Sequence, residues 1–112
     1  MTMPWLIKRE TAIETNVATY ALERYRVASI KVNVMGNAGY PDRIFLFPKH
    51  AAWLEFKRAG EEPSKLQYAR IAELEALGYV VGWVDNEADG RAFIDGCASD
   101  AILLWKDRHG KQ

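Results

Sequence analysis

The chain has 112 residues, 49% of them hydrophobic, which matches one compact domain with a single core. Its 15 basic and 15 acidic side chains cancel, so any polyanion has to be met by a local patch rather than by net charge. Cys97 is the only cysteine, which excludes an internal disulfide and a cysteine-based zinc site. No apolar run approaches the length of a membrane span and no signal segment is recognisable, so we expect a soluble cytoplasmic protein.

The first third of the chain predicts a helix followed by a strand. Residues 8–26 carry a helical stripe, with Thr11 as a candidate N-cap; the stripe consists of Ile13, Val17, Tyr20, Ala21 and Arg24. Residues 28–35 then alternate with the period of a half-buried strand. Ile30 is expected to face the core in this pattern, and Lys31 the polar side.

The middle of the chain predicts two short strands in a hairpin. Residues 44–47 form a continuous apolar run, which predicts a strand buried on both faces. Pro48 to His50 supply a break, and residues 52–57 form the next strand. A loop at residues 36–39 precedes this pair, and Pro41 fixes its exit.

The second half predicts two more helical regions around a fourth strand. Residues 64–77 read as a helix that stops at Gly78, and residues 79–84 as a strand. A short helix within residues 86–96, a last helix from Ser99 to Trp105 and a frayed polar tail follow. The helical crossover would make the third and fourth strands parallel in a mixed sheet flanked by helices.

Two carboxylates and a lysine stand at the edges of the predicted hairpin. Asp42 opens its first strand and Glu55 lies near the end of its second, so the hairpin brings the two carboxylates together. Converging carboxylate oxygens suit Mg²⁺. Period two places Glu55 and Lys57 on one face, with Phe56 opposite and its backbone carbonyl available as a further ligand.

A lysine beside a metal-bound water can orient and deprotonate that water, or neutralise the charge of a phosphoryl transition state. The alternative is that Asp42 caps the turn after Pro41, while Glu55 and Lys57 form a solvated strand face. The three groups within one short window favour a metal-dependent phosphodiesterase centre.

Two possible capping boxes give further polar residues a second interpretation. Ser64 and Gln67 stand at the N-cap and N3 positions, yet Gln67 also lies on the helix face expected to meet the sheet. Thr11 and Glu14 show the same spacing, so Glu14 is either a cap or an active-site carboxylate. Glu10, one turn earlier, is its competitor.

The order of Pro41-Asp42 and Glu55-Phe56-Lys57 resembles the PD-(D/E)xK nuclease signature. Further motifs follow in a fixed order along the chain: Gly39-Tyr40-Pro41-Asp42-Arg43-Ile44, Ser64-Lys65-Leu66-Gln67 and Leu77-Gly78-Tyr79. Together with the signature, they resemble the VRR-NUC (virus-type replication-repair nuclease) domain, in its small stand-alone, phage-type members. The resemblance covers a core of about residues 10–94, and residues 97–112 form a C-terminal helix and tail. We expect residues 1–112 to form a single domain.

The resemblance implies an α/β fold, the restriction-endonuclease-like core with a mixed central β-sheet flanked by helices. It also implies DNA cleavage with one or two Mg²⁺ ions, or Mn²⁺ as a substitute. Asp42 and Glu55 match the metal-holding residues of the family and Lys57 matches its catalytic lysine. Glu14 matches a helix glutamate that extends the metal site, and Gln67 would orient water or phosphate.

Stand-alone members are thought to act as homodimers on four-way junctions, so the resemblance implies a Holliday-junction resolvase, in the bacterial host cytoplasm if the chain is phage-encoded. The candidates for DNA contact are Lys31, Arg43 and Ser64, although Lys31 is equally explained as an exposed strand lysine. Two alternatives stay open: a non-catalytic DNA-binding or assembly module on the same fold, and a nuclease of duplex DNA.

Overall fold

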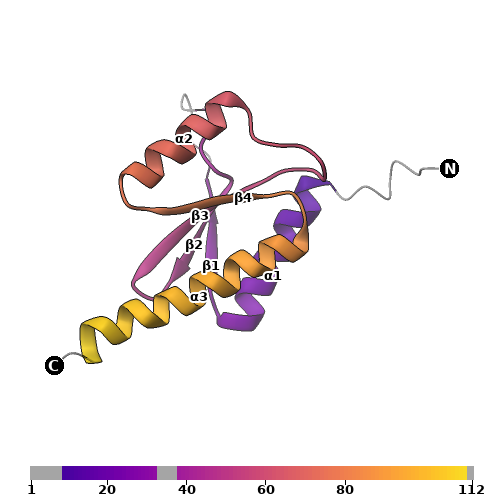
Figure 1. Ribbon diagram of the computed structural model, residues 1–112. Coiled ribbons are helices and arrows are strands. Elements are labelled where there is room, and N and C mark those ends of the chain that lie inside the picture. The colour runs from indigo at the N-terminus through magenta and orange to yellow at the C-terminus, as the bar shows by residue number, and fades with distance from the viewer. Residues whose placement is uncertain (1–8, 33–37, 111–112) are drawn as a thin grey trace.

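The computed structural model describes residues 9–32 and 38–110, the stretch from 100 to 110 by its backbone alone. In chain order its elements are α1 (Glu10–Tyr25), β1 (Ala28–Lys31), β2 (Arg43–Phe47), β3 (His50–Phe56), α2 (Lys65–Ala76), β4 (Val80–Val84) and α3 (Glu87–Gly110). The strands form one sheet in the order β1-β2-β3-β4. Helices α1 and α3 lie together against one face of this sheet, and α2 lies on the other side (Figure 1).

The pairing of the strands confirms the predicted mixed sheet. Strands β1, β2 and β3 are antiparallel neighbours, whereas β4 runs parallel to β3. Helix α2 is the crossover between that parallel pair, as expected from its position in the chain. Pro48 and Lys49 alone connect β2 to β3, because Phe47 is already paired with His50.

The core lies between the sheet and the α1–α3 layer. From the strands it takes Phe45, Phe47, Ala52, Leu54, Phe56 and Val84, and from the helices Ile13, Val17, Ala21, Ile94, Cys97 and Ala98. Strand β2 is therefore buried on one face only, and the prediction of burial on both faces was wrong. Leu46 on its outer face is 44% exposed, because α2 lies nearer β4 and leaves β2 uncovered on that side.

Strand β1 also faces the opposite way from the prediction. Ile30 is 52% exposed on the outer face, while Ser29 and Lys31 share the α1 face with Arg43 and Phe45. The reason is that α1 presents the carboxylate of Glu14 to this corner of the sheet, where a cationic strand face is the better complement. Residues 33–35 of the predicted strand lie outside the described residues.

Of the two predicted capping boxes, the structure contains only the one at the start of α2 among the described helix ends. Helix α1 begins after Arg9, with no side-chain hydrogen bond to its N-cap among the described residues. Thr11 lies inside α1 and its carbonyl accepts a bond from Thr15, so the predicted Thr11 cap was wrong. The Ser64–Gln67 box at the start of α2 is formed in full, as its spacing predicts.

Helix α3 is continuous where the sequence predicts two helices and a frayed tail. Ser99 lies within it and the helix runs to Gly110. Asn86 caps its start by accepting the backbone N–H of Asp89. No described helix is both long and apolar enough to cross a membrane.

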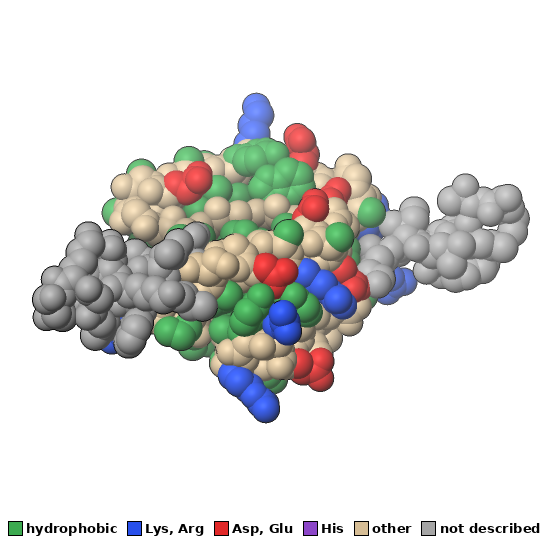
Figure 2. Space-filling model, turned by 60° about the horizontal axis from the view of Figure 1, so that its bottom comes forward, with side chains coloured by type: hydrophobic (Ala, Val, Ile, Leu, Met, Phe, Trp, Pro, Cys, Tyr) green, Lys and Arg blue, Asp and Glu red, His purple; other side chains and the backbone are tan. Residues whose placement is uncertain are grey.

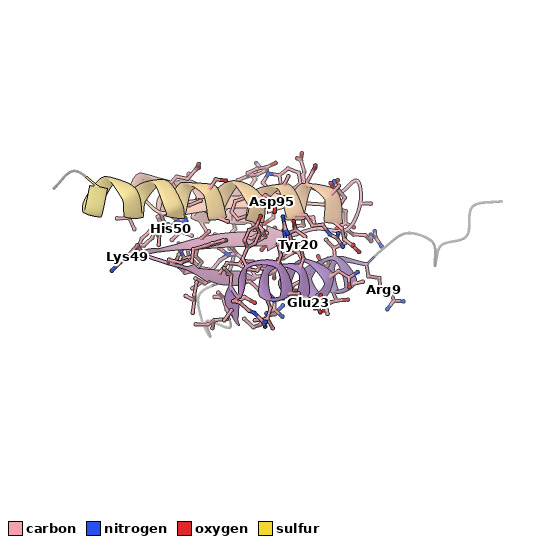
Figure 3. The ribbon with its side chains drawn as sticks, turned by 90° about the horizontal axis from the view of Figure 1, so that it is seen from below. Arg9, Tyr20, Glu23, Lys49, His50 and Asp95 are labelled. Carbon is pink, nitrogen blue, oxygen red and sulfur yellow. The ribbon has the colours of Figure 1, made fainter. Side chains whose placement is uncertain are left out.

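Helices α1 and α3 are held together by a carboxylate that binds two phenols. The hydroxyl groups of Tyr20 and Tyr25 both donate to Asp95 Oδ1, at 2.7 and 2.6 Å. Figure 3 shows Tyr20 and Asp95 directed toward each other across the two helices. These bonds lower the pKa of Asp95 and raise the pKa of both tyrosines, so the charged carboxylate favours the folded state until acid protonates it.

The close approach of these helices depends on Gly90, and Gly90→Ala is expected to destabilise the fold by about 1–3 kcal/mol. A Cβ at residue 90 would lie 2.5 Å from a methyl carbon of Val17, which is fully buried. Gly96→Ala in the same helix is the matched control, because a Cβ there meets nothing within 4 Å. We expect that substitution to stabilise by roughly 0.5–1 kcal/mol. Urea unfolding of both variants checks the pair, and equal shifts would contradict this packing.

Candidate active site

The hairpin places Asp42 directly beside Glu55, as predicted. Arg43 pairs with Leu54, so the next position along each strand brings Asp42 opposite Glu55. Asp42 is fixed from both sides: its Oδ2 accepts the backbone N–H of Phe56 at 2.8 Å, and its carbonyl accepts the N–H of Val32 at 2.8 Å. Backbone groups of the strands on either side thus fix Asp42 at the end of the central strands.

Glu55 is a buried carboxylate, 3% exposed, with an incomplete set of partners. Its Oε2 accepts Gln67 Nε2 at 2.7 Å, and Lys57 Nζ lies 3.6 Å from the same oxygen. Its Oε1 is buried and has no hydrogen-bond partner within the described part of the chain. Burial and the neighbouring charge of Asp42 raise the pKa of Glu55 to about 7, against the opposing effect of Lys57. The nearby ammonium of Lys57 thus offsets only part of the negative charge of the two carboxylates.

Gln67 serves as a helix cap and as a partner of Glu55 at the same time. Its side-chain Oε1 accepts the backbone N–H of Ser64, while its Nε2 donates to Glu55. Ser64 Oγ in turn accepts the backbone N–H of Gln67 at 3.2 Å. The capping box therefore fixes which end of the amide faces the sheet. Gln67 is both a helix cap and a residue directed at the carboxylate pair, as the two interpretations of the sequence proposed. Ser64 is used in the cap, and its contact with DNA stays a prediction.

Lys57 lies on the same side of the chain as Glu55, as period two predicts, and its side chain is 15% exposed. Its backbone N–H donates to the carbonyl of Val84, which extends the parallel pairing by one residue. The chain beyond it is held by Asp85, whose Oδ2 accepts the N–H of Gly60 at 3.0 Å. This bond, together with Asn86, lowers the pKa of Asp85. Nothing in the sequence singles out Asp85, because its role comes from a contact across 25 residues.

The remaining predicted residues form a second cluster. Lys31 Nζ lies 2.8 Å from both oxygens of Glu14, and Arg43 Nε donates to Oε2 of the same carboxylate at 2.7 Å. Among the described residues, no three acidic, histidine or cysteine side chains are close enough together to hold a metal ion. The structure therefore does not bring Glu14 into one metal-binding group with Asp42 and Glu55. Glu10 is exposed and lines a surface hollow with Arg9 and Arg58.

Three aromatic residues beside the two carboxylates had no functional role predicted from the sequence. Trp53 of β3 contacts Tyr40 and Tyr79 on the outer face of the sheet, with ring centres 6.3 and 6.4 Å apart. Arg70 of α2 lies over the ring of Tyr40 at 4.9 Å. In the sequence Tyr40 and Tyr79 entered only as members of the motifs that resemble VRR-NUC domains, and Trp53 only as part of an apolar strand.

Comparison with known proteins gives matches of fold alone. No protein-family model matches the chain, and no curated protein matches it in sequence. The solved structure of a VRR-NUC domain protein superimposes with a TM-score of 0.65 at 21% identity, covering 80% of this chain and 87% of its own. A second structure, of a VRR-NUC domain, gives a TM-score of 0.62 at 23% identity, covering 74% and 95%. The chain has the VRR-NUC fold.

The VRR-NUC fold confirms the predicted restriction-endonuclease-like architecture, a mixed four-stranded sheet between helices. Within it the residues selected from the sequence divide into two groups at the same end of the strands but on opposite faces of the sheet. The first is the carboxylate pair of Asp42 and Glu55 with its partners Lys57 and Gln67. The second is the ion cluster of Glu14, Lys31 and Arg43.

Proposed function

We propose that this chain is a metal-dependent nuclease that hydrolyses phosphodiester bonds in DNA at the Asp42–Glu55 pair. The observation that carries the proposal is the buried Oε1 of Glu55, which has no hydrogen-bond partner among the described residues and lies next to a second carboxylate. Buried carboxylates are otherwise paired or bound to metal. The similarity in fold to two VRR-NUC domain structures supports the same class of enzyme.

The donor set fits a hard divalent cation. Asp42 and Glu55 would hold Mg²⁺, with the backbone carbonyl of Phe56 as a third oxygen ligand, and Mn²⁺ would substitute. When bound, such an ion stabilises negative charge on a phosphoryl oxygen and lowers the pKa of a coordinated water. Oxygen-only ligands and the absence of any described cluster of histidine or cysteine disfavour zinc at this position.

The chain's own groups supply orientation and charge around the pair. Gln67 holds Oε2 of Glu55 and is itself fixed by Ser64, so the carboxylate is set in place before substrate arrives. As an ammonium group, Lys57 can orient the attacking water or neutralise the charge that grows on the phosphate; as a neutral amine, it can take up the proton of that water. Its position 3.6 Å from Glu55 keeps it at the reacting end of the strand.

A branched DNA such as a four-way junction is the proposed substrate, and a homodimer the proposed assembly. Both come from the resemblance to stand-alone VRR-NUC domains. The outer face of β1 and β2 supports the dimer, because Ile30 and Leu46 are 52% and 44% exposed there. A junction with twofold symmetry suits two related active sites.

Direct titration with Mg²⁺ tests the proposed metal pair without relying on catalysis. Wild type is expected to bind the ion in isothermal titration at pH 8, where Glu55 is ionised. Asp42→Asn keeps an oxygen for the Phe56 N–H but removes one charged ligand, so it is expected to bind at least about tenfold more weakly. Equal affinities would contradict the proposed site.

The pH dependence of metal binding follows from Glu55. The pKa of Glu55 is raised to about 7 in the folded, metal-free protein. Protonation of Glu55 therefore stabilises this fold fully at a pH below the ordinary carboxyl pKa, and the stabilisation is lost as the pH rises through 7. Mg²⁺ requires the ionised form, so its apparent affinity should be about 30-fold weaker at pH 5.5 than at pH 8. The Mg²⁺-induced rise in Tm is therefore expected to be much larger at pH 8. A rise independent of pH would show that Glu55 is not a ligand.

A further inference from the structure

Helix α2 contacts the chain on both sides of the carboxylate pair. Near the start of the helix, Gln67 Nε2 donates to Glu55 Oε2 at 2.7 Å. One turn later, Arg70 Nε donates to the carbonyl of Ala38 at 3.2 Å, four residues before Asp42. Residues three apart lie on the same side of a helix, so α2 makes both contacts from one side.

The ring of Tyr40 lies between Arg70 and Trp53. The guanidinium carbon of Arg70 is 4.9 Å from the centre of this ring, and the ring centre of Trp53 is 6.3 Å from it. Trp53 stands two residues before Glu55, so the two side chains share the outer face of β3. Tyr40 is therefore held between α2 and β3, the two elements that also position Glu55.

Gly39 allows the chain before Asp42 to lie directly against α2. Its φ is +90°, and a Cβ there would lie 2.7 Å from a side-chain carbon of Leu66 and 3.1 Å from one of Arg70. Among the described residues, no backbone–backbone hydrogen bond involves positions 38–41. Side-chain contacts, including those with α2, therefore hold this segment in place.

Pro41 passes the position of Tyr40 on to Asp42. The proline ring fixes its own φ and restricts the residue before it to extended conformations. Pro41 is also fully buried, so the three residues form a stiff link. The N–H of Phe56 fixes only Oδ2 of Asp42, and the direction of the other carboxylate oxygen depends on the backbone that this link sets.

We propose that Arg70 is a positioning residue for the metal site, which holds Asp42 in place through the ring of Tyr40. The inference rests on the proposed nuclease function. Gln67 holds Glu55 from the same helix, so α2 would set both carboxylates before an ion binds. Mg²⁺ accepts only a narrow range of ligand geometry, and groups behind the ligands accordingly affect its affinity.

The contacts of Arg70 require an arginine. Its planar fork gives one N–H to Ala38 and another to Glu73 at 3.1 Å, while its face covers Tyr40. A lysine keeps the charge but has neither the fork nor the flat face. The ion pair with Glu73 is partly exposed, at 25% and 51% of the two side chains, and such pairs stabilise little. The contacts toward Asp42 are therefore those that matter most.

Arg70→Met and Arg70→Lys test the inference. Each should bind Mg²⁺ about tenfold more weakly than wild type in isothermal titration at pH 8. High Mg²⁺ should restore cleavage to within about threefold of wild type, because Asp42 returns to its place once the ion is bound. Without metal, the backbone N–H of Phe56 should exchange with solvent at least about threefold faster, because its acceptor on Asp42 is held less firmly.

Arg91→Met is the matched control. Arg91 of α3 lies 4.9 Å from the ring centre of Tyr20 and forms an ion pair with Glu87. Its removal deletes the same two kinds of contact from the α1–α3 layer, on the other side of the sheet. The face turned forward in Figure 2 carries basic and acidic side chains side by side over α1 and α3. Mg²⁺ affinity and amide exchange at the site should therefore equal those of wild type.

Wild-type Mg²⁺ affinity in Arg70→Met would overturn the inference, and so would wild-type affinity in Arg70→Lys, since charge alone would then suffice. A salt dependence of DNA binding lowered by about one unit of slope without divalent ions, with Mg²⁺ affinity intact, would make Arg70 a phosphate contact instead. If wild type itself bound no Mg²⁺, the proposed function would fail. The exchange rate of the Phe56 N–H would still decide whether Arg70 positions Asp42.

Discussion

Asp42→Asn is expected to lower metal-dependent DNA cleavage by at least about 10²-fold, the scale seen when a group that stabilises transition-state charge is removed. The substitution is nearly isosteric, and the Asn side-chain oxygen can still accept the N–H of Phe56. The fold should therefore survive. Single-turnover cleavage of a labelled four-way junction in Mg²⁺ measures the loss.

The same variant carries an internal control for folding. Asp42 raises the pKa of Glu55, so removing its charge should relieve repulsion between the two carboxylates in the metal-free protein. The Tm of Asp42→Asn without metal at pH 8 is expected to be equal to that of wild type or higher, and insensitive to Mg²⁺. An inactive variant with a lowered Tm would indicate misfolding, and an active one would exclude Asp42 from the site.

Lys57→Met is expected to slow cleavage by about 10²–10⁴-fold, the range for loss of a general acid or base. Methionine retains the unbranched stem that is largely buried beside Glu55, but removes the ammonium group. Mg²⁺ binding at pH 8 should persist, weakened only because Lys57 lowers the pKa of Glu55 and its removal favours the protonated acid. A variant that binds the metal but reacts slowly would distinguish the catalytic role of Lys57 from the metal-binding role of Asp42.

Cleavage rates in saturating Mg²⁺ over a pH series measure the effect, with Lys49→Met as a lysine control far from the site. If Lys57→Met cleaved within tenfold of wild type, the lysine would have a structural role alone. Rates that recovered at high pH would point to a general-base role, since hydroxide then replaces the base, whereas a loss that persists at high pH would point to an electrostatic role.

The hairpin around the site could be predicted because its information is local. A break was predicted at Pro48 to His50, and the structure shortens it to Pro48 and Lys49; the positions of Asp42 and Glu55 on either side follow from counting residues. The parallel β3–β4 pair was predictable for a similar reason, as a helix between two strands forces a crossover. The capping box of Ser64 and Gln67 is likewise written in four consecutive residues.

The predictions that were wrong concern features that tertiary contacts determine, namely the orientation of β1 and the length of α3. Glu14 meets Lys31 and Arg43 across 17 and 29 residues, and no spacing rule links those positions. That contact reverses the face of β1, so Ile30 points outward. Helix α3 continues past Gly96 and Ser99 although both residues weaken a helix, because its earlier turns are anchored on α1 and the sheet.

The most direct test of the central claim is cleavage by the purified wild-type protein across a panel of four-way junctions, flaps, single strands and linear duplexes. We expect cutting in Mg²⁺ or Mn²⁺, abolished by EDTA, with the four-way junction preferred. Cutting of linear duplexes alone would support a duplex nuclease on the same fold. If every substrate stayed intact in both metals while the protein still bound DNA, the chain would be a non-catalytic binding module, and the proposed nuclease centre would be contradicted.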